Sequence, residues 1–514
     1  MQNPVARAPE SIDYRRGALG LFAAALMVMS AMHNANTSWN VNSRMALVFA
    51  VVEKGTFAID RYEGDNEIFP TGDKAAFGGH FYSDKAFGVS LLCVPVYAAM
   101  RAVARLFDFR WDLQVTIYLL RMVSASIPAA ISLSILWLLL VRAGALPRRA
   151  LVAVALAFFG SIWFAYSTLA MPYSPGIASC LAATYLLCHS PADGLRPGRA
   201  AAIGFLCGFA VICDFLFGPI AVAAIAVVFL IRLPWGRRDR WPALMGSAVV
   251  AGAVPLGLFA AYSYSIFGTL SLPYQYEVIP LFREGMSKGL MGMTRPRLSF
   301  AWFLTFHPYR GVFFWSPWIL VALAGCVLGT RSTGNRRVFG WMGLWAFTSA
   351  LLMNSSYYMW WGGFSMGARL MLPMMAAVPL GLGEVCRRER SSIWWWALVC
   401  TGVISCVLTI PLVLTDPQMH QIEDTARLMN VSLTSALRVP QFEYLRMYYV
   451  GEWFRGAGSR DYLLRVLPLV AIALAAAILV RIAGRLPRYP EHEGHEAHDA
   501  HDRLPSDHRS SLGD

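Results

Sequence analysis

Long apolar stretches recur along the whole chain, and they limit its fold more than any other feature. Stretches of about 18 or more apolar residues are long enough to cross the hydrocarbon core of a bilayer as helices. The composition agrees, because 57% of the 514 residues are hydrophobic and only 15% are charged, against about 25% charged in a typical globular domain. These proportions exclude a soluble enzyme, a disordered scaffold and a fibre. The sequence therefore predicts an all-α, polytopic membrane protein.

The positive charges of the chain concentrate in alternate loops, which indicates the side of the membrane on which each loop lies. The chain has 44 Lys and Arg against 31 Asp and Glu, a formal net charge of +13. Pairs of arginines, such as Arg148 with Arg149 and Arg387 with Arg388, fall in alternate short loops, which is the pattern of inner loops. No basic stripe with interleaved aromatic residues accompanies them, so nucleic acid is not expected as a partner. The nine cysteines form neither CxxC pairs nor a disulfide framework.

Twelve segments are predicted to span the membrane, with both termini on the inner side. They are 17–32, 115–141, 150–168, 175–189, 200–213, 215–231, 243–267, 312–329, 338–354, 369–385, 393–414 and 462–482. A further segment, 87–107, is also apolar enough to span, but it contains Arg101 and Arg105, and counting it would place every later arginine pair outside. We therefore expect 87–107 to lie along the outer interface as an amphipathic helix.

The long loops all fall on the outer side in this topology. They are 34–86, 269–311, 355–368 and 415–461. Loops held by a rigid scaffold often carry function, so residues 1–486 are expected to form one transmembrane domain with a periplasmic active site. The charged, His-bearing tail 487–514 has no apolar periodicity and is expected to be disordered on the cytoplasmic side.

The first outer loop holds the densest set of candidate catalytic groups. Apolar side chains recur at helical spacing over 44–54, so a juxtamembrane helix should present Asn42 and Arg44 beside the first span and end at Gly55. Asp60 follows in the apolar run GTFAID. Partial desolvation there would raise the pKa of its carboxyl group and suit a general base.

An Asp-Lys pair occurs twice in the same loop, as Asp73-Lys74 and Asp84-Lys85. The two pairs bracket two glycines and a histidine in the run TGDKAAFGGHFYSDKAFG. An ammonium beside a carboxylate can hold an anionic phosphate while it keeps a nearby acid ionised, and glycines let backbone amides approach the anion. The same pairs are equally compatible with solvated loop charges.

Two later outer segments carry arginines among aromatic residues. Arg310, in PYRGVFFWSPW, either neutralises a lipid phosphate or anchors the chain at the interface. The segment SSYYMWWGGFSMGARLMLP contains Tyr358, Trp360, Trp361 and Arg369. Its aromatic residues form either an interfacial belt or a platform for stacking a sugar, with Arg369 facing a phosphate at the start of a helix.

One acidic residue lies between two apolar segments. Asp214, in CDFLFG, is an ionisable group at or near membrane depth. Such groups are functional candidates, although the predicted topology places Asp214 at an outer turn.

Four segments, in their order relative to the spans, resemble the GT-C superfamily of membrane glycosyltransferases, in particular glycosyltransferase family 39 and phospholipid-carrier-dependent enzymes. They are NSRMALVFAVVEKGTFAID, GDKAAFGGHFYSDKAFG, PYRGVFFWSPW and YYMWWGGFSMGARLMLP. The resemblance covers most of the chain and implies a GT-C-like bundle of about twelve transmembrane helices, with juxtamembrane helices in the first outer loop. It further implies inverting transfer of a sugar from a polyprenyl-phosphate donor to a lipid, glycan or protein acceptor, on the periplasmic face of a bacterial inner membrane.

The resemblance also implies roles for particular residues, with a loop carboxylate as the general base. Many relatives place an acid two residues before the arginine of the first motif, where this chain has Asn42, so Asp60 is the first candidate base, followed by Asp84 and Asp73. The donor phosphate would be bound by Arg44, Lys74, Lys85, Arg310 and Arg369. The substrate-binding residues would be Asn42, His80, Tyr82, Tyr358, Trp360 and Trp361. No metal ligands are assigned, because these cations already cover the phosphate; a divalent cation could assist.

Two other functions fit the same architecture. The first is a transporter or flippase of a lipid-linked glycan. Transporters often contain internal repeats with binding sites at mid-membrane, whereas no repeat relates the two halves of this chain and its polar residues concentrate in one outer loop. The second is a polysaccharide polymerase or ligase, which would use the same carrier and differ in the acceptor. The sequence does not specify the sugar or the acceptor.

Overall fold

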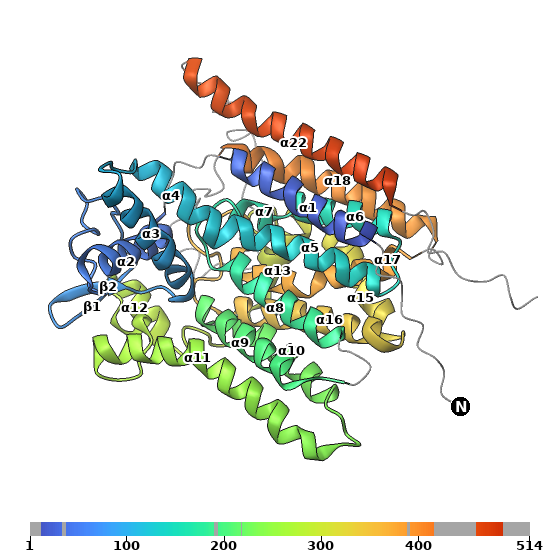
Figure 1. The fold of residues 1–514 in the computed structure, drawn as a ribbon, viewed down its shortest axis with the longest axis horizontal. Helices are drawn as coiled ribbons and strands as arrows, with labels where there is room; N and C mark the ends of the chain where they lie inside the picture. Colours follow the sequence, from blue (N-terminus) through green and yellow to red (C-terminus); the bar gives the residue numbers. More distant parts are fainter. Residues whose placement is uncertain are drawn as a thin grey trace, which may run out of the picture.

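The computed structural model describes residues 12–32, 38–189, 194–216, 218–387, 391–415 and 459–486, and these residues are mostly helical. The long helices run in one common direction and form a bundle (Figure 1). The main ones are α1 (Ile12–Ala31), α5 (Ile127–Arg142), α6 (Pro147–Phe159), α8 (Tyr173–Cys188), α9 (Pro197–Cys213), α10 (Gly218–Ile231), α11 (Trp241–Phe267), α15 (Trp318–Thr330), α16 (Gly334–Ser356), α18 (Ser392–Thr415) and α22 (Ser459–Arg485).

Several helices are long and apolar enough to cross a membrane. Within the described residues there are five, Gly88–Leu106, Leu113–Arg142, Arg238–Phe267, Ser392–Leu414 and Val466–Arg485, and α8, α9, α10 and α15 are shorter apolar helices. The predicted all-α class with several spans is thus confirmed. The count of twelve spans stays a prediction, and most of the loop 415–461 and the whole tail 487–514 lie outside the described residues.

Three segments predicted as continuous spans are interrupted, and that part of the prediction is wrong. Segment 150–168 consists of α6 and α7 (Ile162–Tyr166), and 312–329 consists of α14 (Val312–Trp315) and α15. Segment 369–385 consists of η4 (Arg369–Ala376), η5 (Val378–Gly381) and α17 (Leu382–Val385). Proline accounts for two of the breaks, since Pro317 precedes α15 and Pro373 and Pro379 cannot donate an amide hydrogen bond within 369–385.

The predicted juxtamembrane helix is confirmed as α2 (Trp39–Lys54). The Ser38 hydroxyl accepts a hydrogen bond from the Val41 amide at its start, and Gly55 ends it in the left-handed conformation (φ 64°). Helix α3 (Gly88–Leu106) packs against α2. Figure 1 shows both at one end of the bundle, called the outer end below. The interfacial position of 87–107 stays a prediction, because α3 is also long enough to span.

A β-hairpin lies at the same end of the molecule (Figure 1). Strand β1 (Lys74–Phe77) pairs antiparallel with β2 (His80–Ser83), with Phe77 opposite His80. Gly78 (φ 59°) and Gly79 (φ 83°) form the two-residue turn between them, as a type I′ turn requires. A Cβ atom on either glycine would meet nothing within 4 Å. The glycines therefore serve the turn, and the expectation that they bring amides to a phosphate stays a prediction.

The remaining elements connect these parts of the molecule. They are α4 (Leu113–Arg121), the π-helical segment η1 (Met122–Ser126), η2 (Arg238–Arg240), η3 (Pro273–Tyr276), α12 (Pro280–Ser287) and α13 (Leu298–Thr305). Segment η1 joins α4 to α5 without a loop, and η3 packs against β1. The second contact brings residues about 200 positions apart in sequence to the outer end.

Candidate functional site

Lys85 lies within a cluster of carboxyl groups at the outer end. Its Nζ is 2.9 Å from Asp73 Oδ2 and 2.6 Å from Asp84 Oδ2. Glu277 completes the cluster, because one oxygen from each of the three acids lies within 4.8 Å of the others. The Lys85 side chain is 12% exposed and that of Asp84 is 2% exposed. Charges brought this close and this deep must compensate one another.

The register of the hairpin explains why the Asp-Lys pair occurs twice. Lys74 pairs with Ser83. Asp73 comes just before strand β1 and Asp84 just after strand β2, so the two residues meet at the open end of the hairpin. Like charges directly opposite each other across two strands are destabilising. The Lys85 ammonium bonds to both carboxylates and removes that repulsion.

Glu277 reaches the cluster from the loop between α11 and α12. It forms an isolated bridge with Ala75, and the next amide, that of Val278, donates to the Lys74 carbonyl (3.0 Å). These bonds add the segment after η3 to the edge of the hairpin. Glu277 is 3% exposed, and the sequence analysis did not select it.

The cluster shifts the proton affinities of its members in a consistent way. Burial, and then the charge of Asp84, raises the pKa of Glu277 to about 10. Burial also raises the pKa of Asp84, against the opposing effect of Lys85. For Lys85, burial acts to lower the pKa, but the charges of Asp73 and Asp84 outweigh it and the pKa is raised. These shifts favour a charged Lys85 ammonium and a neutral Glu277 at neutral pH.

Arg44 places a second cation beside the cluster. It is 3% exposed on α2, donates to the Asn40 carbonyl (3.1 Å) and to the Asn40 side chain, and its Nε has no hydrogen-bond partner among the described residues. Burial lowers the pKa of Arg44, and the charges of Asp84 and Asp214 oppose that effect. Arg44 therefore lies between the acids of the hairpin and Asp214.

Arg369 is the third cation, at the start of η4. Tyr173, Tyr166 and Asp73 are near enough to interact with it electrostatically. The Arg369 Nε has no hydrogen-bond partner within the described part of the chain. Gly362 (φ 76°) bends the preceding loop over this side chain, because a Cβ there would lie 3.0 Å from Arg369 Cγ.

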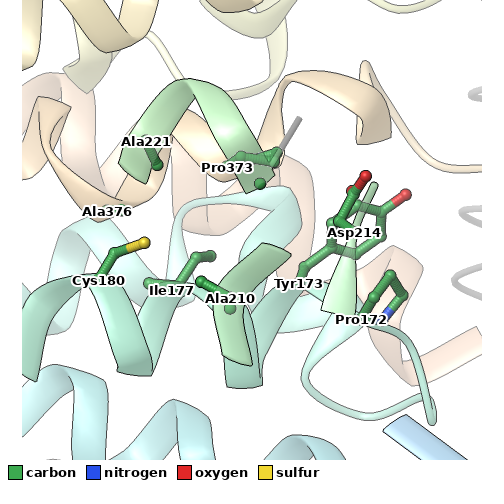
Figure 2. Close-up of a pocket in the computed structure, with 11 residues that line it drawn as sticks. Pro172, Tyr173, Ile177, Cys180, Ala210, Asp214, Ala221, Pro373 and Ala376 are labelled. Atoms are coloured by element: carbon green, nitrogen blue, oxygen red, sulfur yellow. The ribbon is translucent and has the colours of Figure 1, made fainter. Parts of the chain in front are cut away.

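A narrow apolar pocket lies beside these charges, between α8, α9, α10 and η4. Figure 2 shows Tyr173 and Asp214 with their oxygen atoms close together at one end of it. The other end is lined by Ile177, Cys180, Ala210, Ala221 and Ala376. The polar end adjoins the cations, because Tyr173 interacts electrostatically with Arg369, Asp214 and Arg44. Arg44 and Arg369 thus lie within electrostatic range of the polar end of this apolar slot.

The structure places Asp60 apart from this cluster. One oxygen of Asp60 lies 3.1 Å from His80 Nδ1, and the other accepts a hydrogen bond from the Phe81 amide (2.9 Å). The side chains of Asp60 and His80 are 39% and 60% exposed. The expected desolvation of Asp60 is therefore wrong, because the apolar run before it does not cover its carboxylate.

Three further predicted residues form contacts within the outer end. Lys74 pairs with the buried Glu63, on the other side of the hairpin from its neighbour Asp73. Asn42 donates to the Pro70 carbonyl (2.7 Å). Tyr82 packs edge-on against Phe267, with the ring centroids 6.1 Å apart. Lys74 therefore is not brought to the cations that surround the pocket.

The two tryptophans proposed as a sugar platform lie in the core. Trp360 and Trp361 are both 0% exposed. Trp360 packs against Phe300 and Phe303, with ring centroids at 5.2 and 4.9 Å. Neither a sugar nor a lipid can reach their faces, so both interpretations of these rings are wrong. Among the predicted aromatic residues, Tyr358 lies near the cluster, within range of electrostatic interaction with Glu277 and Asp73.

Arg310 is fully buried and bonded to backbone oxygens. It donates to the Ser365 carbonyl, to the Gly363 carbonyl (2.9 Å) and to the Tyr309 hydroxyl (3.2 Å). These bonds fix the loop that precedes Arg369. Arg310 therefore supports the site through its two terminal nitrogens, while its Nε, like those of Arg44 and Arg369, has no hydrogen-bond partner among the described residues.

The sequence analysis missed Glu277, Tyr274 and Tyr173. The first two occur in the run LPYQYEV, where an acid follows two tyrosines within an outer loop, and that pattern was an available signal. Tyr173 carries no such signal, because it begins an apolar helix. Asp73, Asp84 and Glu277 also form the set of acids that could hold a metal ion, but the Lys85 ammonium already neutralises two of them.

Comparisons with known proteins complete the description of the chain. No family model and no curated protein matches the sequence. Two solved structures of ArnT from Cupriavidus metallidurans are similar to it, one bound to undecaprenyl phosphate and one in the apo state. Each is 13% identical and covers 92% of this chain and 76% of ArnT, with TM-scores of 0.45 and 0.44.

Proposed function

We propose that this protein is an integral-membrane glycosyltransferase that moves a sugar from a polyprenyl-phosphate donor to an acceptor on the periplasmic face of a bacterial inner membrane. One observation carries the proposal. Cations from three separate elements, Arg44, Lys85 and Arg369, lie near carboxyl groups, and two of them, Arg44 and Arg369, interact electrostatically with Tyr173 at the polar end of an apolar pocket. A ligand with a phosphate head and a hydrocarbon tail fits that combination.

The cations would bind the phosphate of the donor. The Nε atoms of Arg44 and Arg369 have no partner among the described residues, so both guanidinium groups keep donors for a ligand. Guanidinium groups match phosphate oxygens geometrically, and hydrogen bonds between charged partners are about twice as strong as neutral ones. Lys85 would stabilise the negative charge that develops on the phosphate as it leaves. The first isoprene unit would enter the apolar slot, which would have to widen to admit it.

A carboxylate of the Lys85 cluster would act as the general base. It takes the proton of the acceptor hydroxyl, the oxygen attacks the anomeric carbon, and the bond to the phosphate oxygen breaks with its electron pair. A single displacement of this kind inverts the anomeric centre. Such a base contributes about 10²–10⁴-fold to the rate when it is in reach of the proton.

Asp73 suits the role of base better than the other candidates. Its side chain is 16% exposed and lies beside Lys85 and near Arg369, so an acceptor can reach it next to the bound phosphate. Asp84 is more deeply buried and bonds to Lys85 and to Ser43 (3.3 Å), which suits a residue that holds Lys85 in place. Asp60 lies with His80 and shares no contact with these cations.

Release of free polyprenyl phosphate from radiolabelled polyprenyl-phosphate sugars tests the proposal directly. Membranes with native acceptors would contain wild type, Asp73→Asn or Asp60→Asn at equal protein levels. We expect wild type and Asp60→Asn to consume a donor and Asp73→Asn to lose about 10²–10⁴-fold of the rate. Loss with Asp60→Asn alone would move the base to the Asp60–His80 pair.

The same assay separates the other functions. If no donor in a broad panel is consumed while labelled lipid still crosses the bilayer, the protein is a flippase and the proposal fails. Growth of the labelled product by repeated sugar units would identify a polymerase.

A further inference from the structure

Glu277 is a buried carboxyl group that the proposed reaction does not use. It is 3% exposed, and its Oε1 has no hydrogen-bond partner within the described residues. The backbone fixes its position, through the bridge to Ala75 and the bond from the Val278 amide to the hairpin. One oxygen of its side chain lies within 4.8 Å of an oxygen of Asp84.

A hydrogen bond between these two neighbouring carboxyl groups requires a proton. Two ionised carboxylates have only acceptor oxygens, so a bond between them exists only if one of the two is protonated. Asp84 has the Lys85 ammonium 2.6 Å away, which favours its charged form. The proton therefore belongs on Glu277, and burial together with the Asp84 charge raises the pKa of Glu277 to about 10.

Charge balance leads to the same assignment. Asp73, Asp84 and Lys85 together carry a charge of about −1 when all are ionised, and an ionised Glu277 would bring a third carboxylate to one ammonium. Repulsion between acids within 4.8 Å is relieved when one of them stays neutral. The titratable groups that face Glu277 are Asp73, Asp84, Lys85, Tyr357 and Tyr358.

We propose that Glu277 is a positioning residue, which keeps its proton at neutral pH and donates it in a hydrogen bond to Asp84, so that Asp84 holds Lys85 in place. The catalytic consequence of this role rests on the proposed function, because Lys85 is to meet the departing phosphate. The protonation itself does not, and the experiments treat the two separately.

Thermal unfolding of the purified full-length protein in detergent, from pH 5 to pH 9, tests the protonation without any turnover. In the unfolded chain Glu277 ionises above about pH 4.3, whereas in the folded protein it keeps its proton. Wild type should therefore lose stability as the pH rises, by up to about tenfold in the unfolding equilibrium per pH unit. Glu277→Gln cannot ionise, so its stability should fall less steeply over the same range.

A matched control is Glu63→Gln. Glu63 is also a buried glutamate at the hairpin, 5% exposed, but it pairs with Lys74. Removing its charge leaves that ammonium without its partner, so this variant should unfold at lower temperature than wild type at pH 7.

If Glu277→Gln is too unstable to purify, infrared spectra of wild type and Asp84→Asn decide instead. The carbonyl stretch of a protonated, hydrogen-bonded carboxyl group should be present in wild type and shifted in Asp84→Asn.

Two results would overturn the assignment. One is an equal pH dependence of stability in wild type and Glu277→Gln, or no band from a protonated carboxyl group in wild type. The other is stabilisation of wild type, but not of Glu277→Gln, by Mn²⁺ or Zn²⁺ alone, since the three acids would then form a cation site.

Donor turnover measures the positioning role. Glu277→Gln still donates to Asp84 through its amide and should keep most of the wild-type rate at pH 7, whereas Glu277→Ala should lose about 10–100-fold, as partners of active groups usually do. Equal loss in both variants would contradict the role. If wild type itself consumes no donor, the proposed function fails, and the unfolding and infrared results still decide the protonation.

Discussion

The two ends of the helix bundle both contain buried or half-buried cations, but the cations have different partners. At the inner end, Arg148 donates to the carbonyls of Leu486 (2.7 Å) and Gly484 (2.9 Å), and Arg149 donates to the carbonyl of Arg387 (3.1 Å). Carbonyls at the ends of helices have no partner within the helix. These arginines therefore complete the ends of α22 and α17, and their charge is used by the fold.

The outer end leaves part of its hydrogen-bonding capacity unused. The Nε atoms of Arg44 and Arg369 have no partner among the described residues, although Arg44 is buried and Arg369 is half-buried. The Nε of Arg310 is unpartnered there too, but both of its terminal nitrogens are bonded to the protein. Within the described residues, the Lys85 ammonium bonds to the carboxylates of Asp73 and Asp84, which a ligand can replace. A cation whose terminal nitrogens are all bonded to the protein stabilises one structure, whereas a cation with donors to spare inside a protein is costly unless a ligand uses them.

The largest expected effect comes from replacing one cation at each end of the bundle, which tests whether the two ends differ in function. Lys85→Met should lower kcat/KM for the polyprenyl-phosphate donor by about 10²–10³-fold, because charge on the leaving phosphate loses its stabilisation. Arg148→Met should leave kcat/KM unchanged and cost about 0.3–1 kcal/mol of stability, through the lost bonds at a helix end. Turnover and thermal unfolding of both variants measure this. A loss of turnover in Arg148→Met equal to that in Lys85→Met would refute the division between the two ends.

The next prediction compares two arginines of the outer end itself. Arg369→Gln should raise KM for the donor by about 10–100-fold with little change in unfolding temperature, since it removes a cation that a ligand uses. Arg310→Gln should instead cost about 1–3 kcal/mol of stability, because the carbonyls of Ser365 and Gly363 lose their donor. Donor titrations and unfolding curves separate the two effects. If Arg310→Gln folded as well as wild type but failed to bind donor, Arg310 would be a phosphate ligand after all.

A third prediction concerns the buried tryptophans. Trp360→Phe should cost about 1–2 kcal/mol of stability, because it leaves a cavity against Phe300 and Phe303. KM for the donor should not change, since the ring is 0% exposed. An increase in KM at unchanged stability would restore the sugar platform and would show that the ring becomes accessible in the working enzyme.

Features that depend only on residues close together in the sequence were predicted well. The helix ending at Gly55 follows from apolar spacing and a left-handed glycine, and every predicted span contains helix. The repeated Asp-Lys pair also indicated a real cluster, because a short hairpin brings its two flanking residues together whatever surrounds it. Such signals are local, and elements far away in the sequence do not alter them.

The errors concern exposure, which depends on packing between distant segments. An apolar run precedes Asp60, yet nothing packs over its carboxylate in the part of the chain that is described. Trp360 and Trp361 were expected at a surface, but α13 covers Trp360. Glu277 reaches the hairpin from about 200 residues away through a bridge that no spacing rule predicts. Candidate residue types could therefore be found from sequence, while their grouping into one site could not.

The smallest expected effect comes from the hairpin turn, and it tests whether proximity to the cluster is enough to make a residue functional. Gly78 has φ of 59°, and nothing lies within 4 Å of a Cβ placed there. Asparagine tolerates this conformation and is favoured in type I′ turns before glycine. Gly78→Asn should therefore change stability by less than about 0.5 kcal/mol and leave donor turnover unchanged, as unfolding curves and the release assay would measure. A clear loss of turnover in a stable Gly78→Asn protein would mean that the backbone at the turn approaches the donor, and the functional surface would then extend from the Lys85 cluster to the tip of the hairpin.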